Sequence, residues 1–248
     1  MLDKKTPQEI KLLREGGQKL SEILHSVARQ VKSGSTGKEL NQLAEELIEK
    51  AGGSPAFKHY NGFPAGLCVS INQTVVHGVP NDQPFQEGDL IGLDLGMKYK
   101  GLYTDMAITV GVGQLSREAQ QLLEITKQAL DIGLAQVKPD NHISDIGKAI
   151  EKFIKPFGYG IVRDLAGHGV GRSVHEEPTV PNYNPGKKTE EMFEGLVIAI
   201  EPMIIMGGDY RVKTGENKWD VIAQDNSLTA HFEHTVAVTK DGHLIITE

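Results

Sequence analysis

The feature that most constrains the fold of this chain is a short segment that occurs twice. Glu87–Asp94 (EGDLIGLD) and Glu194–Glu201 (EGLVIAIE) each contain a Glu-Gly pair, an apolar strand-like run and a terminal acid. Segments with a helical apolar period precede both copies, and their apolar positions also align. We therefore predict a pseudo-two-fold α+β architecture, in which strands from residues 7–112 and 113–248 join over one site.

Apolar spacing and capping signals predict four helices, arranged as two pairs. Thr6-Pro7-Gln8-Glu9 and Thr36-Gly37-Lys38-Glu39 are capping boxes at the start of the first two helices. The helices are expected over residues 7–31, 37–51, 116–137 and 144–157. Runs rich in β-branched residues predict strands over residues 66–71, 74–79, 89–95, 102–111, 160–165, 196–206 and 233–246.

Two aspartates interrupt runs that otherwise have the composition of buried strands. Asp94 follows Leu90–Leu93, and Asp105 precedes Ala107–Val110. A hairpin that turns at Tyr99–Lys100 would set the two acids directly opposite each other, with Cβ atoms about 4.5–5.5 Å apart. Two like charges at that distance repel, so either one acid is protonated or a cation lies between them. The alternative is a turn elsewhere, with both acids at a solvent-facing edge.

The second half of the chain contains acids in matching places. Glu201 lies inside an apolar run, and Glu233 occupies the position that corresponds to Asp105 after an insertion. His168 adds an imidazole between two glycines, which permit a close backbone approach. Four carboxylates carry four negative charges, which two divalent ions neutralise and one does not. We therefore predict two ions of Mn²⁺, Co²⁺, Fe²⁺ or Zn²⁺ at a hydrolytic centre. A structural zinc site is not expected, because the set contains no cysteine.

Other kinds of chemistry have little support in this sequence. The chain has no Gly-x-Ser-x-Gly, P-loop or dinucleotide-binding motif. Its single cysteine, Cys68, lies in an apolar run and is interpreted as part of a pocket wall rather than as a nucleophile. The formal net charge of −7 argues against binding to nucleic acid or anionic lipid, and neither a secretory signal nor a transmembrane run is apparent. We expect one domain of 248 residues with no membrane association.

The motifs of this chain resemble those of type I methionine aminopeptidases, which belong to peptidase family M24 and have the pita-bread (creatinase/aminopeptidase) fold. The resemblance extends from Thr6 to Thr247. The metal-binding motifs of the family match Asp94, Asp105, Gly167-His168-Gly169-Val170-Gly171, Glu201-Pro202 and Glu233-His234. Its two substrate-histidine motifs match Val76-His77-Gly78-Val79-Pro80 and His175-Glu176-Glu177-Pro178. The resemblance implies a pseudo-two-fold antiparallel sheet covered by two pairs of helices.

The resemblance also implies a role for each metal-binding residue. Asp94, Asp105 and Glu233 would hold one of two divalent ions. Asp105, His168, Glu201 and Glu233 would hold the other, so that Asp105 and Glu233 bridge the pair. A hydroxide bridging the two ions would attack the first peptide carbonyl, while Glu201 relays protons.

The implied substrate is the N-terminal methionine of nascent proteins and peptides whose second residue is small. His175 would contact the carbonyl oxygen or the tetrahedral intermediate, and His77 the scissile amide or the next residue. The methionine pocket would be formed by Tyr60, Phe63, Cys68, His77 and Trp219. The implied protein is a cytoplasmic monomer, and association with the ribosome stays open.

Related proteins of the same architecture are weaker matches. Prolidases usually carry an additional N-terminal domain, and type II methionine aminopeptidases carry a long helical insertion, neither of which we expect here. Creatinase-like members and a metal-free binding module would have lost ligand residues, whereas this chain retains all five. Phe57 and Val174 depart from the pattern of the family, which leaves the width of the pocket open.

Overall fold

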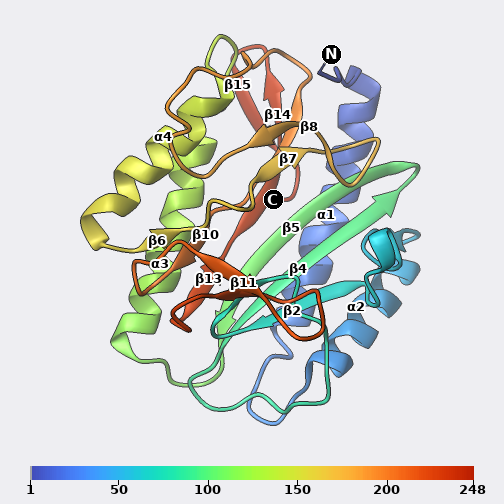
Figure 1. Cartoon of the computed structure of the whole chain (residues 1–248). Coiled ribbons are helices and arrows are strands. Elements are labelled where there is room, and N and C mark those ends of the chain that lie inside the picture. Colours follow the sequence, from blue (N-terminus) through green and yellow to red (C-terminus); the bar gives the residue numbers. More distant parts are fainter. Residues whose placement is uncertain (1) are drawn as a thin grey trace.

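The computed structural model describes residues 2–248, and Figure 1 shows its four main helices in two pairs. These helices are α1 (Pro7–Ala28), α2 (Gly37–Lys50), α3 (Arg117–Leu134) and α4 (Ile143–Ile154). Thr6 and Thr36 form the predicted capping boxes, in which the cap hydroxyl accepts a bond from a helix amide and a glutamate accepts one from the cap amide. The four predicted helices are confirmed, although the first ends at Ala28 rather than at residue 31.

A nine-stranded antiparallel sheet lies at the centre of the molecule. Its order is β1-β4-β5-β14-β9-β7-β8, with β2 also paired to β4 and β15 to β14. The strands are β1 (Ser54–Pro55), β2 (Leu67–Ile71), β4 (Leu90–Tyr99), β5 (Leu102–Gly111), β7 (Gly167–Gly169), β8 (Glu176–Val180), β9 (Val197–Ile200), β14 (Glu233–Thr239) and β15 (Gly242–Ile245).

Two three-stranded sheets and two short 3₁₀ turns complete the structure. One small sheet has the order β13-β10-β6 and the other β11-β12-β3. Their strands are β3 (Thr74–Val76), β6 (Gly160–Ile161), β10 (Met203–Ile205), β11 (Val212–Thr214), β12 (Val221–Ala223) and β13 (Thr229–His231). The 3₁₀ turns are η1 (Tyr60–Gly62) and η2 (Lys155–Phe157).

Each pair of helices packs against its own half of the central sheet. Figure 1 shows α1 and α2 against the half that contains β4 and β5, and α3 and α4 against the half that contains β9 and β14. Two apolar cores fill these layers, one around Leu24, Leu40 and Leu93 and the other around Leu122 and Ile198. Burial of this apolar surface is the main term that stabilises the fold. The predicted α+β architecture with two helix pairs is confirmed.

The hairpin formed by β4 and β5 differs from the predicted register. Its turn is Lys100–Gly101, where φ is 48° and 88°. A two-residue type I′ turn needs positive φ at both positions, and glycine adopts this conformation without strain. Asp94 is therefore opposite Ala107, and Asp105 is opposite Gly96. The prediction that the two aspartates are directly opposite each other is wrong, because they are diagonal neighbours on one face of the sheet.

Several predicted strands are shorter or interrupted, among them the run over residues 74–79, of which only Thr74–Val76 is a strand. The run over residues 196–206 divides into β9 and β10 at Glu201-Pro202, because a proline nitrogen cannot donate to a ladder. The run over residues 233–246 forms the hairpin β14–β15, and only Gly160–Ile161 of the run 160–165 is paired. The interruption at Pro202 releases Glu201 from the ladder at the end of β9.

Candidate metal centre and substrate cavity

One cavity, here called the site cavity, collects every side chain that the sequence analysis assigned to a site. Its volume is about 790 Å³, within the range of ligand-binding pockets. The predicted site residues that line it are Tyr60, Phe63, Cys68, His77, Asp94, Asp105, His168, His175, Glu201, Trp219 and Glu233. Residues from both halves of the chain thus meet in a single space.

Strand register explains how the four acids come together. Asp94 is opposite Ala107 of β5, and Ala107 is in turn opposite Glu233 of β14. Opposite residues share one face of a sheet, so the two acids flank a small side chain. Asp105 lies two residues from Ala107 on the same face. The β9–β14 ladder ends one residue before Glu201, which leaves Glu201 close enough to Glu233 to repel it.

Two buried threonine hydroxyls join the halves of the molecule beside the acids. Thr235 Oγ1 accepts a hydrogen bond from Asp105 N at 3.0 Å and donates one to Asp105 O at 2.8 Å. Thr109 Oγ1 makes the equivalent pair with the backbone of His231, at 2.9 and 2.8 Å. The backbones of Asp105 and His231 are therefore each fixed by a residue from the opposite half.

The glycines on either side of His168 allow the close backbone approach that the sequence predicted. A Cβ atom on Gly167 would lie 2.3 Å from the carbonyl oxygen of Ala199, and one on Gly169 would lie 2.2 Å from that of Glu177. No larger residue fits at either position without displacing a neighbouring strand. The glycines thus let β7 pack tightly between β8 and β9 and carry His168 into the site cavity.

Asp105, His168 and Glu233 form a compact group of possible metal ligands. One ligand atom from each lies within 4.8 Å of those of the other two. His168 Nδ1 is 2.8 Å from the carbonyl oxygen of Gly169, which can only accept, so Nδ1 carries the proton. The lone pair of Nε2 then faces the acids, 3.7 Å from Glu201 Oε1. A histidine ligand held by its second nitrogen has this tautomer.

Burial raises the pKa values of all four acids, and neighbouring carboxylates add to the effect at Asp94, Asp105 and Glu233. Burial, together with the charge of Glu201, raises the pKa of Asp105 to about 7, and burial raises the pKa of Glu201 to about 8. The pKa values of Asp94 and Glu233 rise well above their ordinary range, first through burial and then through neighbouring carboxylates. Such a cluster is unfavourable unless protons or cations neutralise it.

Several oxygens of this cluster lack the partners that buried polar atoms normally have. Within residues 2–248, Asp94 Oδ1, Asp105 Oδ1 and Glu233 Oε1 have no hydrogen-bond partner. Buried polar atoms of folded proteins are almost always paired. Carboxylate oxygens with one imidazole are a donor set that divalent transition metals accept. The residues present therefore fit a metal centre.

Two further imidazoles in the site cavity are neutral at pH 7. Burial lowers the pKa of His77 to about 4 and also lowers the pKa of His175. His175 lies at the exposed mouth, where its Nδ1 is 3.1 Å from the hydroxyl of Tyr60. Its ring centroid is 4.3 Å from that of His168. Neutral imidazoles of this kind each keep one N–H that can donate to a carbonyl oxygen.

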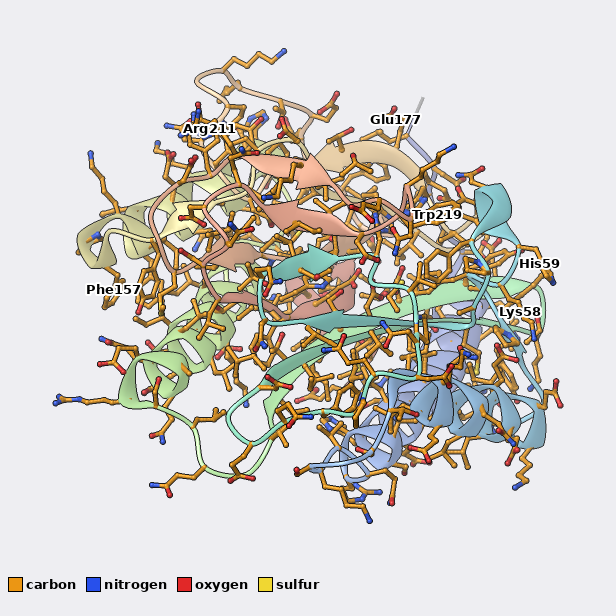
Figure 2. All side chains as sticks on the ribbon, turned by 60° about the horizontal axis from the view of Figure 1, so that its bottom comes forward. Lys58, His59, Phe157, Glu177, Arg211 and Trp219 are labelled. Atoms are coloured by element: carbon orange, nitrogen blue, oxygen red, sulfur yellow. The ribbon has the colours of Figure 1, made fainter. Side chains whose placement is uncertain are left out.

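An apolar pocket adjoins the acids within the site cavity. Phe57, Phe63 and Cys68 are buried residues that line it, and Ala65 and Val174 belong to the same apolar cluster, against which Tyr60 and Trp219 pack. The rings of Phe63 and Trp219 meet edge to face, with centroids 5.3 Å apart. Trp219 comes from the connection between β11 and β12, and Figure 2 shows it on the side of the molecule that carries Lys58 and His59. The pocket therefore combines residues from both halves.

Cys68 has the environment of a wall residue. Its exposed fraction is 4%, and burial, with the charge of Asp94 next in importance, raises the pKa of its thiol well above the ordinary value. The thiol stays protonated at neutral pH, which argues against a role as a nucleophile.

His231 is a site residue that the sequence analysis did not select. Its side chain is buried, and its Nε2 lies 3.5 Å from Glu201 Oε2 with no hydrogen-bond partner among residues 2–248. The only local signal for it was its place two residues before Glu233, where β13 ends and β14 begins. His231 is thus a buried imidazole adjacent to Glu201.

Replacing His231 by alanine is expected to weaken divalent-metal binding by about 10–100-fold, the cost of losing an outer-shell partner. Titration with Mn²⁺ measures the affinity. His25→Ala, a change at an exposed position of α1, is the matched control. If the His231 variant bound Mn²⁺ as tightly as the control, His231 would be a core residue with no influence on the centre.

Comparisons with known proteins agree with this geometry. The model of metallopeptidase family M24 matches residues 11–240. The methionine aminopeptidase of Clostridium perfringens is 41% identical over 247 residues, which cover 100% of this chain and 99% of that protein. The crystal structure of methionine aminopeptidase from Rickettsia prowazekii has a TM-score of 0.97 and 35% identity, with 100% of both chains covered.

A more distant comparison distinguishes between related enzymes. A prolidase from Pyrococcus furiosus has a TM-score of 0.80 and 25% identity, and the match covers 99% of this chain but 65% of the prolidase. Among residues 2–248, no helix has both the length and the apolar character needed to cross a membrane. The pita-bread fold and the resemblance to methionine aminopeptidases are both confirmed. The chain belongs to metallopeptidase family M24, and the relatives that it matches over their full length are methionine aminopeptidases.

Proposed function

We propose that this chain removes the initiator methionine from polypeptides whose second residue is small, with two divalent metal ions as cofactors. The observation that supports this most directly is the presence of four carboxylates, of which Asp105 and Glu233 are buried, and an imidazole beside an apolar pocket. An aminopeptidase of this kind needs a centre that activates water and a pocket that holds one side chain. Since nascent chains are the substrates, we place the protein in the cytoplasm.

Two of the acids are shared between the metal ions in this proposal. Asp94, Asp105 and Glu233 would hold one ion, and Asp105, His168, Glu201 and Glu233 would hold the other. The four negative charges of the acids balance the four positive charges of the ions. A bound pair of divalent ions supplies Lewis acidity and lowers the pKa of a coordinated water.

Three side chains of the site cavity bind the substrate or transfer a proton. His175, at the mouth, donates a hydrogen bond to the carbonyl oxygen of the methionine residue, on which negative charge develops during attack. His77 donates to the scissile amide or to the residue beyond it. Glu201 accepts the proton that the attacking water loses and passes it to the leaving amine.

The apolar pocket sets the preference for methionine. Tyr60, Phe63, Cys68 and Trp219 offer aromatic and sulfur surfaces, which suit the polarizable thioether. The second side chain of the substrate would share the site cavity with the acids and both histidines. Because that space is crowded, a small second residue is favoured.

Comparison of short peptides tests both preferences. We expect kcat/KM for Met-Ala-Ser and Met-Gly-Ser to exceed that for Met-Leu-Ser by about 100-fold, since steric exclusion of a few methylenes is worth about 1–3 kcal/mol each. Leu-Ala-Ser is the control for the first residue. An Ala-Pro dipeptide represents the prolidase reaction. Equal rates for Met-Ala-Ser and Met-Leu-Ser would refute the size preference, and a preference for Ala-Pro would refute the assigned activity.

A further inference from the structure

Lys5 is a buried lysine in the segment that precedes α1. Its exposed fraction is 2%, and its backbone N–H donates to the carbonyl oxygen of Gly195 at 2.8 Å. Its ammonium lies 2.7 Å from Asp3 Oδ2 and 2.5 Å from Glu176 Oε2. Lysine is almost never fully buried unless its charge is paired. The position of Lys5 is therefore tied to that of Glu176.

The second carboxylate oxygen of Glu176 holds the loop between β7 and β8. Glu176 Oε1 accepts hydrogen bonds from the backbone amides of Arg172 at 2.5 Å and Ser173 at 2.8 Å. The side chain of Glu176 is only 13% exposed. A single carboxylate thus connects the tip of this loop to the ammonium of Lys5.

The N-terminal segment contacts the same loop at two further points. Gly171 has a φ of +139°, and a Cβ atom there would lie 2.5 Å from Lys5 Cε, so the lysine stem fills the space beside the glycine. The guanidinium of Arg172 donates to Glu9 Oε1 at 2.9 Å and also pairs with Asp3. Figure 1 shows the start of α1 at the same end of the molecule as β8.

This loop carries His175 into the mouth of the site cavity. His175 directly precedes Glu176, and the residue before it, Val174, is buried in the same apolar cluster as Phe63 and Cys68. The imidazole itself contacts the hydroxyl of Tyr60 and the ring of His168. Its orientation therefore depends on the conformation of the loop, which Glu176 holds from the other side.

We propose that Lys5 is a positioning residue: through Glu176 it fixes the β7–β8 loop so that His175 is presented to the substrate. Without the ammonium, a buried Glu176 carboxylate would have no compensating charge, which is strongly unfavourable. The carboxylate would therefore turn toward solvent and release the amides of Arg172 and Ser173. The catalytic consequence rests on the proposed function, in which His175 binds the substrate carbonyl.

Lys5→Met tests this proposal, with Lys4→Met at the adjacent exposed position as the matched control. In Lys5→Met, amide hydrogen exchange of residues 171–176 is expected to become at least tenfold faster, with other protected amides unchanged. kcat on Met-Ala-Ser is expected to fall by about 10–100-fold, the effect of misplacing one contact group. Metal content per chain is expected to equal that of the control.

A second variant keeps the test decisive if Lys5→Met does not fold. Glu176→Gln keeps an acceptor for the two amides but loses the charge that faces Lys5, so it is expected to change exchange and kcat in the same direction. Because both changes break one pair, the double variant is expected to lose no more activity than the stronger single variant. Lys5→Arg, which keeps the charge, is expected to restore most of the activity.

Two results would overturn the proposal. One is unchanged exchange of residues 171–176 in both single variants. The other is a general loss of stability with unchanged kcat at temperatures where the variants stay folded. Failure of the proposed function would give a different result. The wild-type protein would not release methionine, but exchange of residues 171–176 would still be faster in Lys5→Met than in wild type.

Discussion

Replacing Asp105 by alanine is expected to abolish both metal binding and release of methionine. In the proposed centre Asp105 is shared by the two ions, so its loss leaves each ion without one ligand. Loss of an outer-shell partner alone costs about 10–100-fold in metal affinity or activity, and loss of a shared ligand is expected to exceed that. Metal analysis after dialysis and kcat/KM on Met-Ala-Ser measure the two effects independently.

Asp105→Asn separates the role of a ligand from a structural role. The amide keeps the shape of the side chain, and the backbone bonds to Thr235 stay in place. Because one of four crowded charges is removed, the metal-free variant is expected to be more stable at pH 8 than the metal-free wild type, although it binds metal more weakly. Asp82→Ala, a change at an exposed position, is the control. An Asp105→Ala protein with the metal content and activity of this control would contradict the assignment.

Removing the metal is expected to make the protein lose stability as the pH rises from about 6.5 to 8. In the metal-free protein the pKa values of Asp105 and Glu201 are about 7 and about 8, raised by burial from 3.8 and 4.5. At pH values above 3.8 and 4.5, the unfolded chain releases the protons of these two acids, whereas the folded protein retains them until the pH approaches the raised pKa values. The free energy of unfolding then falls by up to about 1.4 kcal/mol per pH unit for each retained proton.

At lower pH, buried histidines make the free energy of unfolding rise with pH, which is opposite to the effect of the carboxylates. Burial lowers the pKa values of His77 and His168 to about 4 and that of His231 to about 3. Below about pH 6.5, the ordinary pKa of histidine, the unfolded chain therefore binds protons that the folded protein excludes, and stability rises with pH. The two effects oppose each other in that range. The histidine contribution fades between pH 6.5 and about pH 7.5, so the carboxylates increasingly dominate the change in stability from pH 6.5 to 8.

Urea unfolding at several pH values in this window measures the effect. Metal-free wild type is expected to lose stability steadily, whereas protein saturated with Mn²⁺ is expected to change little, because the ions replace the retained protons. Asp105→Asn, with one acid fewer, is expected to show a shallower decline without metal. A metal-free protein whose stability stays constant or rises from pH 6.5 to 8 would show that the acids do not share one buried site.

Features that depend on neighbouring residues were predictable from the sequence. The capping boxes at Thr6 and Thr36 are local, and both form. The acids at Asp94 and Glu201 stand out because each lies in an apolar run, and the repeat relates one to the other. The predicted strand over residues 196–206 overlooked Pro202, although proline cannot take part in a central ladder.

Features that depend on geometry between distant segments were not predictable. The register of the β4–β5 hairpin follows from the conformation of Lys100–Gly101, and a turn placed one residue earlier changes every pair. Strands β7 and β8 are short and were missed as strands. The pairing of Lys5 with Glu176 joins residues 171 positions apart, and nothing in the local sequence marks Lys5 as buried.

The apolar pocket contains both kinds of feature: those that the local sequence indicates and those that depend on packing between distant segments. Tyr60, Phe63, Cys68 and Trp219 were selected through the resemblance, since aromatic residues taken alone read equally well as ordinary core. The departures at Phe57 and Val174 are both buried in the apolar cluster that contains Cys68, and Phe57 also lines the site cavity. Their effect on the width of the pocket depends on packing among side chains from several elements.

The central claim is that acids from both halves of the chain hold a pair of divalent cations in one cavity. Anomalous scattering from a crystal soaked in Mn²⁺ tests it most directly. We expect two peaks about 3.5–4 Å apart, both adjacent to Asp105 and Glu233. Asp94 should lie next to one peak, and His168 and Glu201 next to the other. A single peak, or peaks away from these five residues, would contradict it.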